Sequence, residues 1–208
     1  MSTIGRALGL VMSLALPLTL TACHGSERNA APRASSPAVG DADHTNSRSI
    51  YGLDLPLTDQ DGHALVLSDL RGRVLVAAMM YSNCKSVCPR VTEDMKGIER
   101  QLAHRDRDRV EFVLFSLDPG RDTPAALRGF AREHGLDPSR WRLLAASQDG
   151  VRDLAAVLGV KYKSESGGEI AHSAMIFVID RDGVVRHRQV GLNQDPRELI
   201  AALDEASH

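Results

Sequence analysis

The sequence predicts an α/β domain with a mixed sheet flanked by helices, and three features of the chain support this class. An unbroken apolar run, Val74 to Met80, has the length and composition of a buried strand. After it, Pro89 to about His104 repeats apolar residues at helical spacing, as an amphipathic helix does. Nearer the C-terminus, two apolar runs enclose Arg181-Asp182-Gly183, which predicts an antiparallel hairpin. Strand–helix–strand units combined with a hairpin indicate a mixed sheet.

Turn and cap signals place the other elements of the first half of the chain. Leu53 to Leu57 and Ala64 to Leu67 are expected to form a hairpin, because a turn sequence rich in Asp and Gly separates them. The run Val110 to Leu117 is rich in β-forming residues and predicts a strand. A helix is then expected from the cap-and-proline sequence Asp122-Thr123-Pro124 to about Gly135.

The second half continues the alternation of strands and helices. Apolar runs and cap residues mark the regular elements, whereas polar residues and paired glycines predict a loop. The expected elements are a strand (Trp141 to Ala145), a helix (Ser147, its cap, to Leu158), a polar loop (Lys161 to Ile170), a hairpin (Ala174 to Asp180 and Val184 to Val190) and a terminal helix that begins at Asp195-Pro196.

The order of these elements indicates a topology. A strand–helix–strand start with a closing hairpin and helix is thioredoxin-like, and the expected hairpin before it is an N-terminal addition. A doubly wound, flavodoxin-like order is the alternative, but it lacks a closing antiparallel hairpin and needs more parallel strands.

Composition excludes several functional classes. The 208-residue chain has a formal net charge of −2, and its basic residues are scattered along the sequence. Aromatic residues make up only 4% of the chain, so neither phosphate contacts nor base stacking are favoured and no nucleic-acid partner is expected. Three cysteines are too few for a disulfide-dense scaffold, so the fold must rest on an apolar core.

Residues 1–22 have the features of a lipoprotein signal peptide. Arg6 supplies a positive charge, and Ala7 to Ala22 form an apolar stretch shorter than the ~20 unbroken residues that a membrane-spanning helix needs. The stretch ends in Leu20-Thr21-Ala22-Cys23, which resembles a bacterial lipobox, so Cys23 is expected to receive the lipid. An uncleaved anchor and a plain secretory signal are the alternatives. Each version places the domain outside the cytoplasm, on the periplasmic side of the membrane.

Residues 23–49 are expected to be a flexible tether, because they are polar, rich in Ala, Pro and Ser, and lack apolar periodicity. The folded domain is expected to occupy residues 50–208. Such a tether would let the domain reach partners in the same membrane, and a passive spacer fits the composition equally well.

Cys84 and Cys88 follow the buried strand directly and lie where a helix begins. The field at a helix N-terminus and the nearby cations Lys85 and Arg90 favour thiolates. On one helix face their Cβ atoms would be about 5–6 Å apart, whereas a disulfide needs about 3.5–4.5 Å. The spacing therefore favours a shared metal ion over a redox disulfide. A permanent disulfide that pins the start of the helix is the structural alternative.

His172 is the third candidate ligand. It directly precedes an apolar strand, and in a thioredoxin-like fold the chain that enters this strand passes beside the cysteines. The imidazole is therefore expected to complete a Cys₂His site, although a histidine at a strand edge is more often solvated. Redox thioredoxins place a cis-proline near this position, but the chain has no proline between Pro138 and Pro196. A general disulfide exchanger is accordingly less favoured.

The donor set indicates which metals fit. Two thiolates select Cu(I) or Zn(II) over hard cations, and an imidazole serves Cu(II) as well. A structural zinc site has four protein ligands, whereas the sequence offers three in suitable positions. Three ligands with an open side suit a site that gives its metal away.

Asp118 is a weaker candidate site residue. It ends a predicted strand beside the expected site, where it could contact His172 or a partner, but a turn-forming Asp-Pro is the simpler interpretation. Six further histidines lie in polar segments and are interpreted as solvated. They are His24, His44, His63, His104, His134 and His187.

Three segments taken in order carry a resemblance to a known family. They are Cys84-Lys85-Ser86-Val87-Cys88-Pro89, then Ser116-Leu117-Asp118-Pro119-Gly120-Arg121-Asp122-Thr123-Pro124, then Ala171-His172-Ser173. With these segments the chain resembles the Sco/SenC family over about residues 50–205. The resemblance implies a membrane-attached, thioredoxin-like copper protein that helps to load the binuclear copper centre of cytochrome c oxidase subunit II.

Carried over by position, the resemblance makes Cys84, Cys88 and His172 the copper ligands. Asp118 matches an acidic residue that the family associates with partner contact or site tuning. Lys85 is a departure, because many members carry proline or a neutral residue there.

Three functions from different classes compete. The first is a copper carrier, which is not an enzyme in the strict sense. The second is a thiol–disulfide oxidoreductase that uses Cys84 and Cys88 to keep a partner's cysteines reduced. The third is a non-catalytic periplasmic interaction domain with a structural disulfide. The Cys₂His expectation favours the first.

Overall fold

The regular elements are those of a mixed α/β domain. A computed structural model describes residues 49–102 and 109–208 of the chain. The strands are β1 (Pro56–Asp59), β2 (Ala64–Val66), β3 (Val74–Met80), β4 (Val110–Ser116), β5 (Trp141–Ala146), β6 (Tyr162–Ser164), β7 (Ile170–His172), β8 (Met175–Ile179) and β9 (Val185–Val190). The helices are α1 (Val87–Gln101), α2 (Pro124–Glu133), α3 (Gln148–Leu158) and α4 (Arg197–Ser207), with short 3₁₀ helices η1 (Ile50–Gly52), η2 (Leu67–Leu70) and η3 (Ser166–Gly168).

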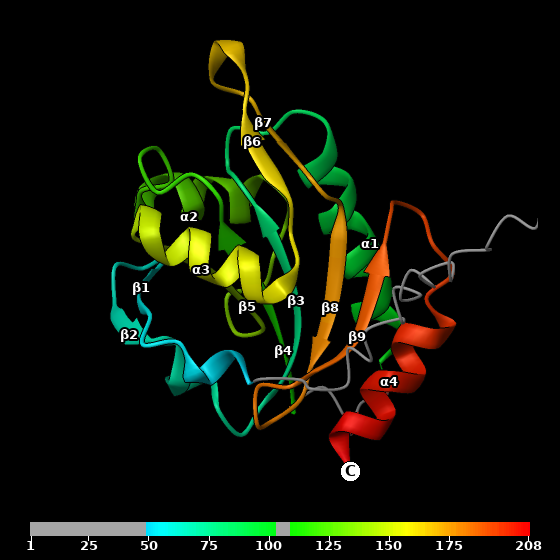
Figure 1. Cartoon of the computed structure of the whole chain (residues 1–208). Helices are drawn as coiled ribbons and strands as arrows, with labels where there is room; N and C mark the ends of the chain where they lie inside the picture. The colour runs from blue at the N-terminus through cyan, green and yellow to red at the C-terminus, as the bar shows by residue number, and fades with distance from the viewer. Residues whose placement is uncertain (1–48, 103–108) are drawn as a thin grey trace, which may run out of the picture. The chain divides into compact units, whose positions relative to one another are not determined.

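A seven-stranded sheet in the order β2-β1-β5-β4-β3-β8-β9 forms the centre of the domain (Figure 1). Strands β3, β4 and β5 are parallel neighbours, and α1 and α2 supply their two connections. Strand β8 joins the other side of β3 in antiparallel register and continues into β9, while the β1–β2 hairpin joins β5. This order is thioredoxin-like with an added N-terminal hairpin, so the predicted fold class is confirmed.

The core lies on both faces of the central strands. Every residue of β3 and β4 is buried, and Figure 1 shows α3 in front of the sheet and α1 behind it. A strand covered on both faces must be apolar throughout rather than alternating, which is what the run Val74 to Met80 displays. The aromatic rings of Phe112 and Trp141 stack with their centroids 4.8 Å apart and join β4 to β5.

The predicted helix boundaries that rest on cap residues are confirmed. The Thr123 hydroxyl accepts the N–H of Ala126 at the start of α2, whose first residue is Pro124. The Ser147 hydroxyl accepts the N–H of Gly150 at the start of α3, which ends at the left-handed Gly159.

The first predicted strand is misplaced. Leu53 to Leu57 was expected to be extended, but β1 begins at Pro56 and the preceding residues include η1. Leu55 and Leu57 are buried as core residues, so the apolar signal was correct and only the strand limits were wrong. The partner strand, expected from Ala64 to Leu67, is observed as Ala64–Val66.

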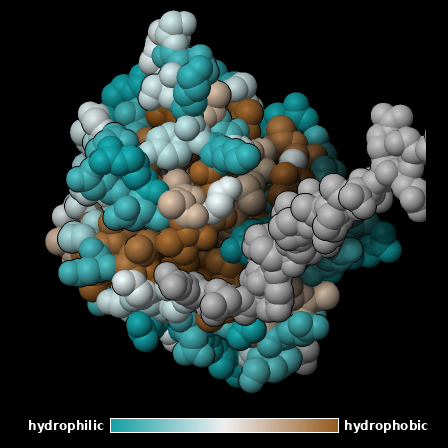
Figure 2. Space-filling model, in the orientation of Figure 1, coloured by the Kyte–Doolittle hydropathy of each residue, from teal (hydrophilic) through white to brown (hydrophobic). Residues whose placement is uncertain are grey.

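The prediction of a polar loop from Lys161 to Ile170 is also wrong, because this segment forms most of a two-stranded ribbon. Strands β6 and β7 pair in antiparallel register, with Tyr162 opposite His172. Each strand has three residues, and the segment is largely exposed and polar, so it carries no apolar alternation from which a strand could be predicted. The ribbon projects beyond the end of the sheet in Figure 1, and its tip is hydrophilic in Figure 2.

The turn between β8 and β9 generates a stability prediction. Gly183 has a φ of +84°, and a Cβ there would collide with Tyr51 and Ser49, which pack under the turn. Gly72 has a φ of +82°, but a Cβ there would meet nothing within 4 Å. We expect Gly72→Ala to lower the free energy of unfolding by about 1–2 kcal/mol through backbone strain alone. Gly183→Ala should lower it by a further ~1–3 kcal/mol through the collision.

Urea denaturation of both variants and the wild type measures these values. Equal losses for the two substitutions would contradict the packing of Tyr51 and Ser49 against this turn.

Candidate metal centre

The loop between β3 and α1 carries the two cysteines. Cys84 lies just before the helix, and Cys88 lies in its first turn, so β3 fixes one end of the loop and α1 the other. The Cys84 sulfur accepts the backbone N–H of Cys88 at 3.3 Å, whereas the N-cap residue Ser86 makes no side-chain cap. Cys84 therefore satisfies one of the free N–H groups at the helix N-terminus, a role usually filled by an oxygen.

The helix begins two residues earlier than the sequence predicted. Pro89 was expected near the first helical position, but α1 starts at Val87. The reason is that the N–H groups of the whole first turn lack helical partners, so a proline is tolerated there and marks the start only approximately. The shift places Cys88 inside the helix and leaves Cys84 outside it.

The pKa values of the two thiols are shifted in opposite directions. Burial raises the pKa of Cys84, but hydrogen bonds from the Cys88 thiol and from the backbone N–H groups of Cys88 and Ser86 outweigh it and hold this pKa below that of an ordinary cysteine. Burial raises the pKa of Cys88 well above the ordinary value, and the thiol's hydrogen bond to Cys84 raises it further. Cys84 is therefore the more acidic thiol of the pair, and Cys88 is the less acidic one.

His172 ends β7 and faces the cysteines. Its Nε2 lies 3.4 Å from the Cys88 sulfur, and its Nδ1 lies 3.1 Å from the Ser173 carbonyl oxygen. Because a carbonyl only accepts, Nδ1 carries the proton and Nε2 presents its lone pair to the sulfurs. Burial lowers the pKa of His172 below the ordinary histidine value, against a smaller opposing effect of the Ser173 carbonyl, so the ring is neutral at pH 7.

One sulfur from each cysteine and a ring nitrogen of His172 all lie within 4.8 Å of one another. Two sulfurs bound to one ion at about 2.3 Å can be at most about 4.6 Å apart, so the three side chains fit a single ion with small adjustments. Both cysteines are free thiols, not the permanent disulfide of the structural alternative. The structure thus brings together the three residues that the sequence singled out, and their role as ligands stays a prediction.

A hollow in the surface gives access to the centre. A hollow of about 280 Å³ opens between the β6–β7 ribbon and the start of α1, and its lining includes Cys84 and His172 but not Cys88. Tyr81 also lines this hollow, and its ring packs edge-on against His172 with centroids 6.1 Å apart. A ligand or partner that enters here reaches Cys84 and His172 first.

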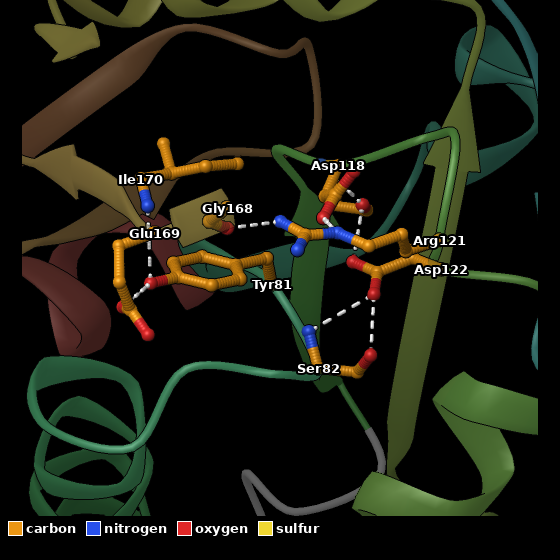
Figure 3. Close-up of polar contacts among 9 residues, drawn as sticks. Tyr81, Ser82, Asp118, Arg121, Asp122, Gly168, Glu169 and Ile170 are labelled. Atoms are coloured by element: carbon orange, nitrogen blue, oxygen red, sulfur yellow. Dashed lines mark hydrogen bonds and ion pairs between the residues drawn. The ribbon is translucent and has the colours of Figure 1, made fainter. Parts of the chain in front are cut away.

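Asp118 makes no hydrogen bond to His172. Its carboxylate binds the guanidinium of Arg121 (Figure 3). The imidazole donates to the Ser173 carbonyl instead. The simpler interpretation of Asp118 as a turn residue agrees with the hydrogen bonds within residues 118–122, since both Arg121 and Asp122 donate their N–H groups to the Asp118 carbonyl.

Asp122 is the site residue that the sequence reasoning missed. It is 2% exposed, and its carboxylate accepts the N–H and hydroxyl of Ser82 and the hydroxyl of Ser116. These bonds hold the start of the cysteine loop to the end of β4 (Figure 3). Burial raises the pKa of Asp122, against the hydrogen bonds from Ser116 and Ser82. Its position before a helix cap suggested only a local role. Its bonds to Ser82 could not be predicted from local pattern, because Ser82 is distant in sequence.

A second group of potential ligands lies in the β1–β2 turn. Asp59, Asp61 and His63 come within the same range, but Asp59 accepts the N–H groups of the other two and the group is a hydrogen-bonded turn. The His63 side chain is 78% exposed, as the interpretation of a solvated histidine requires.

The N-terminal predictions concern residues outside the described part of the chain. These are the signal peptide at 1–22, the lipidated Cys23 and the tether at 23–49, of which only Ser49 is described. In the part that the structure does describe, no helix has the length and apolar character to span a bilayer.

Fold and site together define a class: a thioredoxin-like domain that presents two thiols and one imidazole at the end of its sheet. The family model described as SCO1/SenC matches residues 43–208. The chain therefore belongs to the SCO1/SenC family, as its motifs suggested.

Three solved structures show what this chain is similar to. A SCO1/SenC family lipoprotein from Bacillus anthracis is 29% identical, with a TM-score of 0.68 over 75% of this chain and 95% of that one. ScoI from Bradyrhizobium japonicum, solved with copper bound, is 26% identical, with a TM-score of 0.58 over 73% and 96%. BsSco, described as having a disulfide switch and as a member of the Sco family of cytochrome c oxidase assembly proteins, is 27% identical, with a TM-score of 0.64 over 73% and 90%.

The opposite pKa shifts of the two thiols predict that they react at different rates. In the metal-free protein we expect iodoacetamide to modify Cys84 much faster than Cys88, since each pKa unit changes the thiolate fraction about tenfold. The Cys84 rate should reach half of its plateau at a lower pH than the ~8.5 of a free cysteine. Peptide mapping after timed modification between pH 6 and 9 measures both sites and separates them from Cys23. Equal rates in the folded protein, with equal rates in urea as the reference, would contradict the assignment.

Asp122 should contribute to stability, because its carboxylate is buried and accepts several hydrogen bonds. We expect Asp122→Ala to lower the free energy of unfolding by about 1–3 kcal/mol, because Ser82 and Ser116 lose their buried acceptor. Asp61→Ala, which removes a half-exposed carboxylate in the β1–β2 turn, should stay within about 0.5 kcal/mol of the wild type. Urea denaturation measures both values, and an Asp122→Ala effect as small as that of Asp61→Ala would show that this hydrogen-bond network is dispensable.

Proposed function

We propose that this protein binds copper through Cys84, Cys88 and His172, and that it delivers the metal to, or helps to assemble, the binuclear copper centre of cytochrome c oxidase. The observation that carries the proposal is the approach of two sulfurs and one imidazole nitrogen to within 4.8 Å of one another. Support also comes from the similar ScoI, which was solved with copper bound, and from the description of BsSco as an oxidase assembly protein.

The chemistry of the donor set suits copper as cargo. Thiolates favour Cu(I), and the neutral imidazole accommodates either copper oxidation state. Copper entering through the hollow meets the sulfur of Cys84, the more acidic of the two thiols, and the free Nε2 of His172. Cys88 must lose its proton to bind, so loading releases a proton and weakens at low pH.

Delivery requires that the acceptor's ligands replace those of the carrier one at a time. The side that opens to the hollow exposes Cys84 and His172, whereas Cys88 lies behind them in the first turn of α1. An acceptor thiolate would therefore displace the two accessible ligands first and the Cys88 sulfur last. This order keeps the metal bound to a protein sulfur throughout the exchange.

The proposal places the protein on the periplasmic side of a bacterial membrane. Lipidated Cys23 would anchor the chain, and residues 24–49 would give the domain reach to a membrane-embedded acceptor such as cytochrome c oxidase subunit II. The lipobox-like sequence at 20–23 supports the anchor, and the similar protein from Bacillus anthracis is described as a lipoprotein.

A second candidate function is a thiol–disulfide oxidoreductase that keeps the acceptor's cysteines reduced. The unequal acidities of Cys84 and Cys88 favour it, because an attacking thiolate followed by a second thiol is what disulfide exchange requires. The disulfide switch described for BsSco supports the same use of a cysteine pair.

Copper transfer separates the two functions. With a subunit II acceptor whose cysteines are already reduced, we expect the wild type to load copper and His172→Ala to lose at least about tenfold in copper affinity and to transfer poorly. His63→Ala, which removes an exposed histidine, is the matched control and should behave as the wild type. Copper retained by the acceptor measures the transfer.

Transfer by His172→Ala at the wild-type level would remove the imidazole from the site. Activity of the wild type only on an acceptor with oxidised cysteines, without any movement of copper, would favour the oxidoreductase.

A further inference from the structure

The third ligand of the proposed site lies on the least embedded part of the domain. His172 belongs to the β6–β7 ribbon, which projects from the sheet and has an exposed, hydrophilic tip (Figures 1 and 2). Its Nδ1 bonds to the adjacent Ser173 carbonyl, which orients the ring within its own strand but not toward α1. The distance between the imidazole and the sulfurs therefore depends on what holds the ribbon against the cysteine loop.

Tyr81 forms one such attachment. It follows β3 directly, is 1% exposed, and its hydroxyl donates to Glu169 at 2.6 Å and accepts the N–H of Ile170 at 3.2 Å. One side chain thus joins the cysteine loop to the two ribbon residues that stand just before Ala171 and His172 (Figure 3).

Arg121 forms the other attachment. Its guanidinium binds the Asp118 carboxylate and donates to the carbonyl of Gly168 at the ribbon tip (Figure 3). The segment that carries Arg121 is itself fixed to the cysteine loop, because Asp122 holds Ser82. A chain of polar contacts therefore runs from the start of the cysteine loop to the ribbon tip.

Tyr81 and Arg121 bind the consecutive residues 168 to 170 from two different sides. Apolar burial contributes little at the tip, since the residues from Ser164 to Glu169 are exposed and the first buried one is Ile170. If the Tyr81 side chain only filled space in the core, a phenylalanine would serve equally well and the polar contacts of the hydroxyl would not be needed. The hydroxyl and the guanidinium are the groups that fix the ribbon relative to the sulfurs.

We infer that Tyr81 and Arg121 are positioning residues that set the distance of the His172 imidazole from the two cysteine sulfurs, and thereby how long the site retains copper. The inference rests on the proposed function and adds to it the residues that control release. Neither side chain is a ligand in this account, since both act through the strand that carries His172.

A double-mutant cycle in the full-length protein tests this. Tyr81→Phe and Arg121→Gln are prepared alone and with His172→Ala, and the rate of Cu(I) loss to a colorimetric chelator is measured. We expect each single variant to lose copper about tenfold faster than the wild type, the lower end of the effect of removing a group that orients a ligand. With His172 replaced, neither substitution should change the rate further, because the residue through which it acts is gone.

Two matched controls remove the trivial explanation of lost stability. Tyr51 is 5% exposed and its hydroxyl donates to the Leu70 carbonyl, so Tyr51→Phe removes an equally buried phenol bond away from the site. Arg128 pairs with Asp61, and its side chain is about as exposed as that of Arg121, so Arg128→Gln is the control for a lost surface arginine that forms an ion pair. Both controls should release copper at the wild-type rate.

Spectroscopy gives a readout that stability would not move. Loaded with Cu(II), Tyr81→Phe and Arg121→Gln should shift the sulfur-to-copper charge-transfer band toward that of His172→Ala, whereas the two controls should not. In the copper-free protein, the NMR order parameter of the His172 backbone N–H should fall from about 0.85 toward 0.6 in these two variants.

Three results would overturn the inference. One is an equal acceleration of copper loss with and without His172, and another is acceleration by the controls of the same size. The third is an unchanged His172 order parameter in both variants. Failure of the wild type itself to retain copper would contradict the proposed function, and the order parameters would then show separately whether the attachments hold the ribbon.

Discussion

The antiparallel register between β3 and β8 determines where the site can form. Ala78 of β3 lies opposite Ile176 of β8, so the chain that leaves β3 toward Cys84 runs beside the chain that brings His172 into β8. Cys88 and His172 meet in space although they are 84 positions apart in the sequence. A slip of one residue would exchange the side chains that β8 packs on the two faces of the sheet, so the apolar core itself holds the register and the site inherits its precision from the core.

At the centre, the helix N-terminus makes the two sulfurs chemically unequal. Cys84 receives the hydrogen bonds of the first turn, which lower its pKa, whereas burial raises the pKa of Cys88. A buried thiolate without a counter-charge is costly, so Cys88 can ionise only when a cation or a bond to sulfur takes the place of the proton. The same pair is therefore suited to binding a soft cation and to forming a disulfide, and the imidazole beside Cys88 favours the cation.

The sequence was sufficient for whatever depends on apolar pattern, cap chemistry and topology. The buried strand, the caps Thr123 and Ser147 and the convergence of Cys84, Cys88 and His172 all follow from such signals. The sequence was insufficient where long-range polar contacts determine how a segment is placed.

The β6–β7 ribbon illustrates that limit. Its strands are short and the connection between them is polar with paired glycines, so local pattern predicts a loop, and contacts with Tyr81 and Arg121 from other segments hold it in place. Asp122 was missed for the same reason, because its partners Ser82 and Ser116 come from the ends of two different strands. Each of these contacts becomes visible only when the sheet has brought distant segments together.

The contrast between rigid and lightly held candidate ligands would let one domain both bind and surrender a metal, as proposed. Two of the candidate ligands sit on the loop after the buried β3 and in the first turn of α1, whereas the third sits on a ribbon joined by a few polar contacts. Breaking a few such contacts costs far less than opening a core, so local displacement of the ribbon leaves the fold intact. In the proposed carrier, release would begin at His172 while the sulfurs still hold the cargo, and the strength of the attachments at Tyr81 and Arg121 would set how readily it begins.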